Sequence, residues 1–186
     1  KLPLIAERLG YLPLALDLAG ARLIEGMSGE TWLRTFQRVS QIKLGRRSTD
    51  PHENLQICFE LSVEQLRHED RPLFYTLAIF PDDIEIPKEA IIRLWLHLDA
   101  ELTAFDCEEI LTDLARLSLV EYDLESETIA IHDLIYDFIK EKLGADIISV
   151  HENFISACNP EEQPWEYVKP EAYTLKYLVY HLLSAE

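Results

Sequence analysis

The helical spacing of apolar residues is interrupted by one stretch with the spacing of a strand, and this interruption limits the folds that the chain can adopt. Before residue 118 apolar residues recur every three or four positions, as in amphipathic helices. Residues 118–132 read SLVEYDLESETIAIH and instead alternate apolar with polar side chains on either side of the polar turn 125–127. This alternation predicts a β-hairpin. Helices that lead into one hairpin and a closing helix, expected here at 134–143, are in the order of a winged-helix domain.

Three helices are predicted within residues 2–40. Pro13 would lie in the first turn of the second helix, where its missing N–H costs little. The sequence Met27-Ser28-Gly29 should separate the second helix from the third. The segment 43–52, KLGRRSTDPH, is polar, basic and proline-containing, and it is the predicted linker to the next domain.

Residues 53–143 are predicted to form the winged-helix domain. It should begin with two helices, at 54–66 and 71–80. Pro81 should end the second of them, and Pro87 should open another. The following helix is amphipathic, and four of its apolar residues are predicted to face the core: Ile110, Leu111, Leu114 and Leu117.

Residues 144–186 carry further helical patterns, at about 146–157 and 172–183. The predicted fold class is therefore mainly α. It consists of a helical bundle, a winged-helix domain with a small β-hairpin wing, and then further helices.

The amino-acid composition disfavours some classes of binding partner and indicates the cellular compartment. Seventeen Lys and Arg stand against thirty-four Asp and Glu, and the net charge of −17 disfavours nucleic acid and anionic lipid. No apolar run approaches the ~20 residues that span a bilayer. The three cysteines are far apart and suggest neither a disulfide framework nor a zinc site. We expect a cytoplasmic protein. Because the sequence starts at Lys1 and not at a methionine, we also expect it to be a fragment of a longer chain.

The spacing of candidate residues in this sequence does not match the catalytic motifs that were considered. No glycine precedes a Lys-Ser or Lys-Thr pair, so this segment contains no phosphate-binding P-loop. The strings HENLQ and HENFI lack the second histidine of a zinc-protease helix, and the six histidines show no metal-ligand spacing. We predict no catalytic residue and no metal ligand in this segment, and therefore no enzyme activity of its own.

The pair His132-Asp133 stands where the strand pattern gives way to a helical one. Strand alternation places Ile129 and Ile131 on the core face, so His132 should point away from the core. Asp133 directly precedes an apolar-periodic stretch and is the predicted helix N-cap, accepting from the N–H of Ile135 or Tyr136. An imidazole beside a helix N-terminus could contact a phosphate.

Four stretches together resemble a known family. GYLPLALDLAG (10–20), FELSVEQL (59–66), LAIFPDDIEIPKEAIIRLW (77–95) and IHDLIYDF (131–138) occur in this order. They are similar to the GLPL motif, the first winged-helix segment, its Phe-Pro turn and the MHD motif of NB-ARC, or STAND-class, signalling ATPases. The resemblance covers most of the chain, and the ordered set is far more specific than any one motif.

The resemblance implies an architecture. Residues 1–42 would end a first helical domain, residues 53–143 would be the winged helix, and residues 144–186 would begin a second helical region. An upstream P-loop domain would hold ATP or ADP with Mg²⁺. A downstream array, such as WD repeats, would act as the sensor, and the active form would be a homo-oligomer.

The same resemblance assigns site residues. Pro13 would pack against adenine and His132 would bond the β-phosphate of ADP, which keeps the protein autoinhibited until nucleotide exchange. Ser118, at the start of the wing, is a weaker candidate for a contact through water. Two positions depart from the family pattern. Tyr11 replaces the first glycine of the GLPL motif, which puts the backbone near adenine in doubt, and Ile131 replaces the Met of the MHD motif.

Two other classes of function stay open. A DNA-binding winged-helix regulator would read DNA with the helix at 106–117, whose exposed residues are largely acidic and would be repelled by DNA. A helical interaction scaffold without a nucleotide site is equally compatible with this segment. A P-loop sequence before Lys1 would favour the nucleotide switch over the scaffold.

Overall fold

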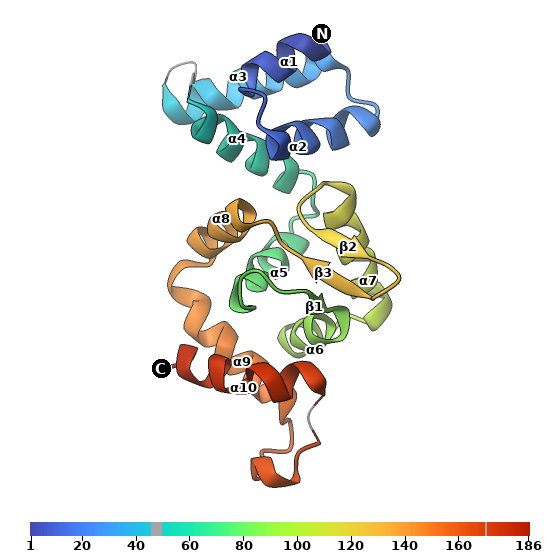
Figure 1. Ribbon diagram of the computed structural model, residues 1–186, viewed down its shortest axis with the longest axis vertical. Helices are drawn as coiled ribbons and strands as arrows, with labels where there is room; N and C mark the ends of the chain where they lie inside the picture. Colours follow the sequence, from blue (N-terminus) through green and yellow to red (C-terminus); the bar gives the residue numbers. More distant parts are fainter. Residues whose placement is uncertain (46–49, 170) are drawn as a thin grey trace. The chain divides into compact units, whose positions relative to one another are not determined.

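The computed structural model describes residues 1–45, 50–169 and 171–186 (Figure 1). Within these residues the chain divides into two compact units. Unit 1 comprises residues 1–68 and 113–119, and unit 2 comprises residues 69–112 and 120–186. The mainly α fold with a small sheet is confirmed. Across the described residues, no helix is both long and apolar enough to cross a bilayer.

Unit 1 is helical, and the three helices predicted before residue 40 are present. Its helices are α1 (Leu2–Arg8), α2 (Pro13–Ile24), α3 (Gly29–Leu44) and α4 (Pro51–Val63), with α4 packed on α2 and α3. Pro13 is in the first turn of α2, as predicted. The Ser28 hydroxyl caps α3 by accepting from the N–H of Thr31 at 3.1 Å, which explains the break before this helix.

The predicted linker 43–52 is shorter in the structure. Lys43 and Leu44 still belong to α3, which ends at Gly45 with a left-handed φ of 62°. Pro51 already opens α4, because the Asp50 carboxylate accepts from the N–H of His52 at 2.8 Å and caps the helix. Residues 46–49 of the predicted linker lie outside the described residues.

The turn between α1 and α2 contains consecutive left-handed residues. Gly10 has φ +63° and Tyr11 has φ +57°, and the N–H of Tyr11 donates to the carbonyl of Ala6 at 3.0 Å. Glycine adopts this conformation at little cost, whereas a residue with a Cβ pays about 1–2 kcal/mol. Tyr11 is also 67% exposed, so its ring gains little from packing. Position 11, which is glycine in the GLPL motif, therefore has a backbone conformation that glycine adopts more readily than tyrosine does.

Replacing Tyr11 with glycine should stabilise unit 1 by about 0.5–1 kcal/mol, the strain released less the extra freedom of the unfolded chain. Urea denaturation of the two proteins would measure this difference. Tyr11→Ala is the matched control, because it removes the ring but keeps the Cβ, and it should bring no such gain. Equal stabilities for the glycine and alanine variants would refute the strain at this position.

Unit 2 contains the remaining elements. These are α5 (Asp70–Thr76), η1 (Leu77–Ile79), β1 (Ile86–Pro87), α6 (Lys88–Leu98), α7 (Ala104–Arg116), β2 (Glu121–Asp123), β3 (Thr128–Ala130), α8 (Asp133–Leu143), η2 (Gly144–Asp146), α9 (Ile147–Cys158), η3 (Trp165–Tyr167) and α10 (Ala172–Ser184). The last residues of α7 are grouped with unit 1. The four apolar residues predicted to face the core are all fully buried: Ile110, Leu111 and Leu114 in α7, and Leu117 directly after it.

The predicted hairpin is confirmed, and its sheet holds one strand more than expected. β2 and β3 pair antiparallel, with Tyr122 opposite Ile129, and β1 pairs with the other edge of β3 through Ile86 opposite Ile129. The strand order among the described residues is thus β1-β3-β2. Ile129 lies in the central strand with none of its surface exposed, and it fixes the sheet to the core.

Polar side chains and aromatic rings complete the core of unit 2. The Trp95 indole N–H lies 3.0 Å from the Thr76 hydroxyl and 3.2 Å from the carbonyl of Leu73. The Tyr136 hydroxyl donates to the carbonyl of Ala78 at 3.1 Å and so joins α8 to η1. Phe80 follows η1, is fully buried and contacts rings of both α9 and α10. These contacts hold the helices on either side of η1 in one unit.

Candidate functional site

His132 is the N-cap of α8. Its backbone is extended, with φ −63° and ψ 137°, and its carbonyl accepts from the N–H groups of Ile135 and Tyr136 at 2.8 and 2.9 Å. Its side chain is 44% exposed, so the prediction that it points away from the core is confirmed. Ile129 is fully buried as predicted, but Ile131 lies beyond the end of β3 and is only partly buried.

The prediction that Asp133 caps α8 is wrong. Asp133 is the first residue of the helix, and its carboxylate accepts from the N–H of Leu134 at 2.7 Å rather than from Ile135 or Tyr136. The reason is the backbone, because the residue with extended φ and ψ and a carbonyl facing the helix is His132. Asp133 still stabilises the helix start, since a carboxylate in the first turn interacts favourably with the helix dipole.

The contacts of the imidazole use one nitrogen. Nδ1 of His132 lies 3.2 Å from the backbone N of Leu134 and is paired with the carboxylate of Asp133. When Nδ1 lacks a proton it accepts from Leu134, and the neutral ring carries its proton on Nε2; in the imidazolium, Nδ1–H donates to Asp133 and Nε2 is again protonated. Nε2–H is a donor in both of these states, whereas a neutral ring that donates Nδ1–H to Asp133 would have Nε2 as an acceptor.

The charges around His132 indicate which group at the start of α8 could contact an anion: the backbone N–H groups or the imidazole. Nδ1 of His132 and the Asp133 carboxylate both lie within hydrogen-bond distance of the N–H of Leu134, one of the donors at the start of α8 that have no partner within the helix. A phosphate at this helix end would therefore meet a carboxylate as well as the dipole. The imidazole Nε2–H, not the helix N-terminus, is the group that fits a phosphate oxygen.

Pro13 is exposed at the first turn of α2. The preceding residue, Leu12, is extended and serves as N-cap without a side-chain bond. Because the proline ring has no N–H and faces solvent, it offers a small rigid apolar surface. Such a surface can pack against a flat aromatic base.

Ser118 follows α7 in a left-handed conformation, with φ 56°. Its N–H donates to the carbonyl of Ala115 at 2.9 Å, and its hydroxyl lies 3.5 Å from the carbonyl of Asp17, at the limit of a hydrogen bond. The hydroxyl is therefore free to exchange that weak contact for water. Arg116, two residues earlier, is paired with Glu25 and with Asp113.

The three predicted site residues are divided between the units. Pro13 and Ser118 belong to unit 1, where the Ser118 hydroxyl reaches the helix that Pro13 opens. His132 belongs to unit 2. The sequence interpretation missed that the imidazole itself caps α8. The signal was present, since an acceptor nitrogen two positions before a backbone N–H resembles the cap geometry of Asn and Asp.

Comparison with known proteins adds relatives over most of the chain. It is 26% identical over 181 residues to Apoptotic protease-activating factor 1 of Homo sapiens, a match that covers 94% of this chain and 14% of that protein. It is 32% identical over 117 residues to a probable disease resistance protein of Arabidopsis thaliana, covering 62% of this chain and 14% of that protein. No protein-family model matches. The chain thus spans about one seventh of the length of these relatives.

Proposed function

We propose that this chain, which is an NB-ARC-like, or STAND-like, fragment, is the regulatory part of an ADP/ATP-dependent signalling switch. The relatives support a signalling-switch family in general terms. The finer proposal is that the winged helix holds bound ADP and keeps the protein autoinhibited. Exchange of ADP for ATP would then permit assembly of a homo-oligomer in the cytoplasm.

One observation carries the proposal. An exposed imidazole is held at the start of α8 by contacts to Nδ1, and its Nε2, in the protonated form, would donate to the β-phosphate of ADP. Pro13 would pack against adenine, and the Ser118 hydroxyl would reach the nucleotide through water. ADP would supply the anionic group that His132 recognises. The triphosphate and Mg²⁺ would be held by a P-loop domain elsewhere in the longer protein, so we propose no catalysis by these residues.

The proposed domains follow the motif order. Residues 1–42 would end the first helical domain, residues 53–143 would form the winged helix, and residues 144–186 would begin the second helical region. The helix at the start of the proposed winged helix is α4, and in the structure α4 packs on α2 and α3 as part of unit 1. A downstream repeat domain, for example of WD repeats, would be the sensor.

Reading of DNA by α7 is disfavoured by its charges. The helix carries Asp106, Glu108, Glu109 and Asp113. Arg116 is its sole basic residue, and Glu25 and Asp113 already pair with it. A surface of this sign repels the phosphate backbone, and no cation of α7 is left to offset the repulsion.

His132→Asn in the full-length protein should lower ADP retention at least about tenfold, the expected loss for one hydrogen bond to a charged group. Asparagine is among the best N-caps, so α8 should keep its start while the imidazole is lost. The measurement is the amount of nucleotide released on denaturation of protein purified from cells, identified by chromatography, together with the fraction assembled.

Three results of this experiment discriminate among the functions. Wild-type protein should release about one ADP per chain, as should the control His97→Gln, which changes an exposed histidine of α6. Unchanged ADP in His132→Asn would reduce His132 to a helix cap. A wild-type protein that carries no nucleotide would favour the interaction scaffold.

A further inference from the structure

Two histidines from neighbouring helices meet in the interior of unit 2. α9 and α10 lie side by side (Figure 1). His151 of α9 is 1% exposed and His181 of α10 is 0% exposed, and their Nδ1 atoms are 2.9 Å apart. Nε2 of His181 lies 3.0 Å from the Tyr173 hydroxyl. This chain of hydrogen bonds connects α9 to α10.

The surroundings of the pair are aromatic. The ring of His181 lies 4.3 Å from Phe154, 5.2 Å from Tyr180 and 6.2 Å from Phe80, measured between ring centroids. The ring of His151 lies 5.6 Å from that of Tyr180. Aromatic rings and phenol groups can accept a hydrogen bond, but they provide no counter-charge for an imidazolium in the way a carboxylate does.

Charged groups on the adjoining elements do not offset a proton on the pair. From α6, Arg93 adds a positive charge, and its guanidinium bonds Glu171 just before α10 and lies 3.4 Å from the Thr174 hydroxyl. η1 presents only apolar residues, and Asp146 of η2 is exposed to solvent. Glu152, which follows His151 on α9, is exposed to solvent, and Asp82 and Asp137 act on Tyr136 of α8. The titratable groups within this aromatic core are phenols and a thiol, among them Tyr136, Tyr173, Tyr177, Tyr180 and Cys158. Lys176 of α10 lies over the ring of Tyr177.

Proton counting shows why the pair must stay neutral. A hydrogen bond between the Nδ1 atoms needs one proton on one nitrogen, and the other must accept. The ring that accepts carries its own proton on Nε2, so the neutral pair holds two protons in all. A second proton between the Nδ1 atoms would place two N–H groups head to head, and a third proton on the pair would create a buried charge without a carboxylate. Burial accordingly lowers the pKa of His151 to about 4. Burial, and then the neighbouring His151, lower the pKa of His181 to about 3.

We propose that His151 and His181 form a proton-sensitive latch that holds α10 against α9 while both rings are neutral and releases α10 as the pH falls. A released imidazole takes up a proton with the ordinary pKa of about 6.5, whereas the docked ring does not. The docked state therefore binds fewer protons, and its stability falls as the pH falls below about 6.5. The loss is complete once the pH is below the pKa of the docked rings. The latch is independent of the proposed nucleotide site.

Hydrogen exchange of the α10 backbone amides at pH 7 and pH 5, corrected for the intrinsic pH dependence of exchange, tests the latch in the 186-residue chain. The open fraction of α10 should rise roughly 20-fold for each histidine that is neutral when docked and free to protonate when released. Peptides from α5, in the same unit, serve as an internal reference and should change less.

Two variants and a second measurement make the test decisive. His181→Gln keeps an acceptor for the Tyr173 hydroxyl but cannot titrate, so it should lose roughly half of the pH effect on a logarithmic scale. The control His97→Gln, on the surface of α6, should keep all of it. If the glutamine variant does not fold, titration of the imidazole C–H signals by NMR in the wild type still decides. An α10 whose protection is equal at both pH values, or a pair that titrates between pH 6 and 7 while folded, would overturn the latch.

Discussion

Replacing Phe80 with alanine should destabilise unit 2 by about 3–5 kcal/mol, the cost of an emptied aromatic site in a packed core. Phe80 is fully buried, and its ring lies edge-on to those of Phe154 and Tyr173, with centroids 5.6 Å away in each case. Both the transfer free energy of the ring and these aromatic contacts would be lost. The amides of α9 and α10 should lose protection first, since these helices supply the partners.

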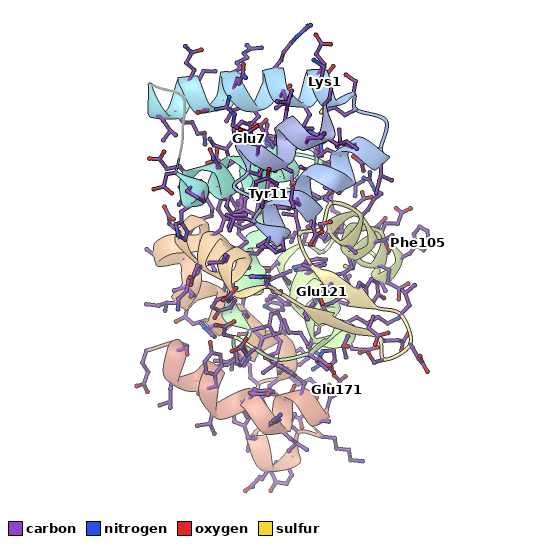
Figure 2. The ribbon with its side chains drawn as sticks, turned by 45° about the horizontal axis from the view of Figure 1, so that its top comes forward. Lys1, Glu7, Tyr11, Phe105, Glu121 and Glu171 are labelled. Carbon is purple, nitrogen blue, oxygen red and sulfur yellow. The ribbon has the colours of Figure 1, made fainter. Side chains whose placement is uncertain are left out.

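The measurement is hydrogen exchange of unit 2 peptides across a urea series, with Phe105→Ala as the matched control. Phe105 is also a phenylalanine of unit 2, but it is 67% exposed at the start of α7 and labelled in Figure 2. Its truncation should change stability by no more than about 0.5 kcal/mol. A Phe80→Ala protein as stable as the Phe105→Ala protein would contradict the central place of Phe80 in this core.

Ile129→Ala should cost about 2–5 kcal/mol, because it empties a buried site in the central strand of the sheet. Ile129 pairs with Ile86 on one side and Tyr122 on the other, so the cavity would loosen both edge strands. His132 follows three residues later. On the proposed role of His132, loss of the strand should also weaken nucleotide retention in the full-length protein even though the imidazole is intact.

Ile131→Ala is the control that shows whether the loss of stability follows the burial of an isoleucine or only its place in the alternating sequence. Alternation of apolar residues treats the two isoleucines as equivalent, but Ile131 lies outside β3 and is partly exposed. Its truncation should cost no more than about 1–2 kcal/mol, in proportion to the smaller buried area. Thermal denaturation of both variants measures the difference. Equal losses would mean that Ile131 is packed as tightly as Ile129.

Local signals explain why so much of the fold could be predicted. The helical spacing that places Ile110, Leu111 and Leu114 on one face needs no knowledge of distant contacts, and the polar turn at 125–127 marks its hairpin by itself. Pro13 likewise indicates a helix start, because proline has a fixed φ and lacks the N–H that would be unpaired in a first turn. Each of these predictions rested on residues close together in the sequence.

What could not be predicted depends on contacts between distant residues. β1 consists of Ile86 and Pro87, too short for any alternation, and it becomes a strand through its pairing with β3. His151 and His181 are thirty residues apart and each looks solitary in the sequence, yet they meet in the core. The cap of α8 fell to His132 rather than Asp133 because the direction of the chain leaving β3 decides which carbonyl faces the helix.

The candidate site came from the resemblance rather than from periodicity. Sequence alternation predicted the outward direction of His132, and the family resemblance supplied the proposed roles of Pro13, Ser118 and His132. Neither could supply the state of the imidazole, since its contacts to the N–H of Leu134 and the carboxylate of Asp133 exist only once α8 has formed.

The small sheet of unit 2 is protected against unwanted pairing on both sides. β1 forms one edge and contains Pro87, which has no N–H to offer a further strand. β2 forms the other edge, where the exposed carboxylates of Glu121 (Figure 2) and Asp123 would repel a like-charged neighbour. Both edges of the sheet therefore disfavour strand-to-strand joining when copies of this acidic chain are crowded together.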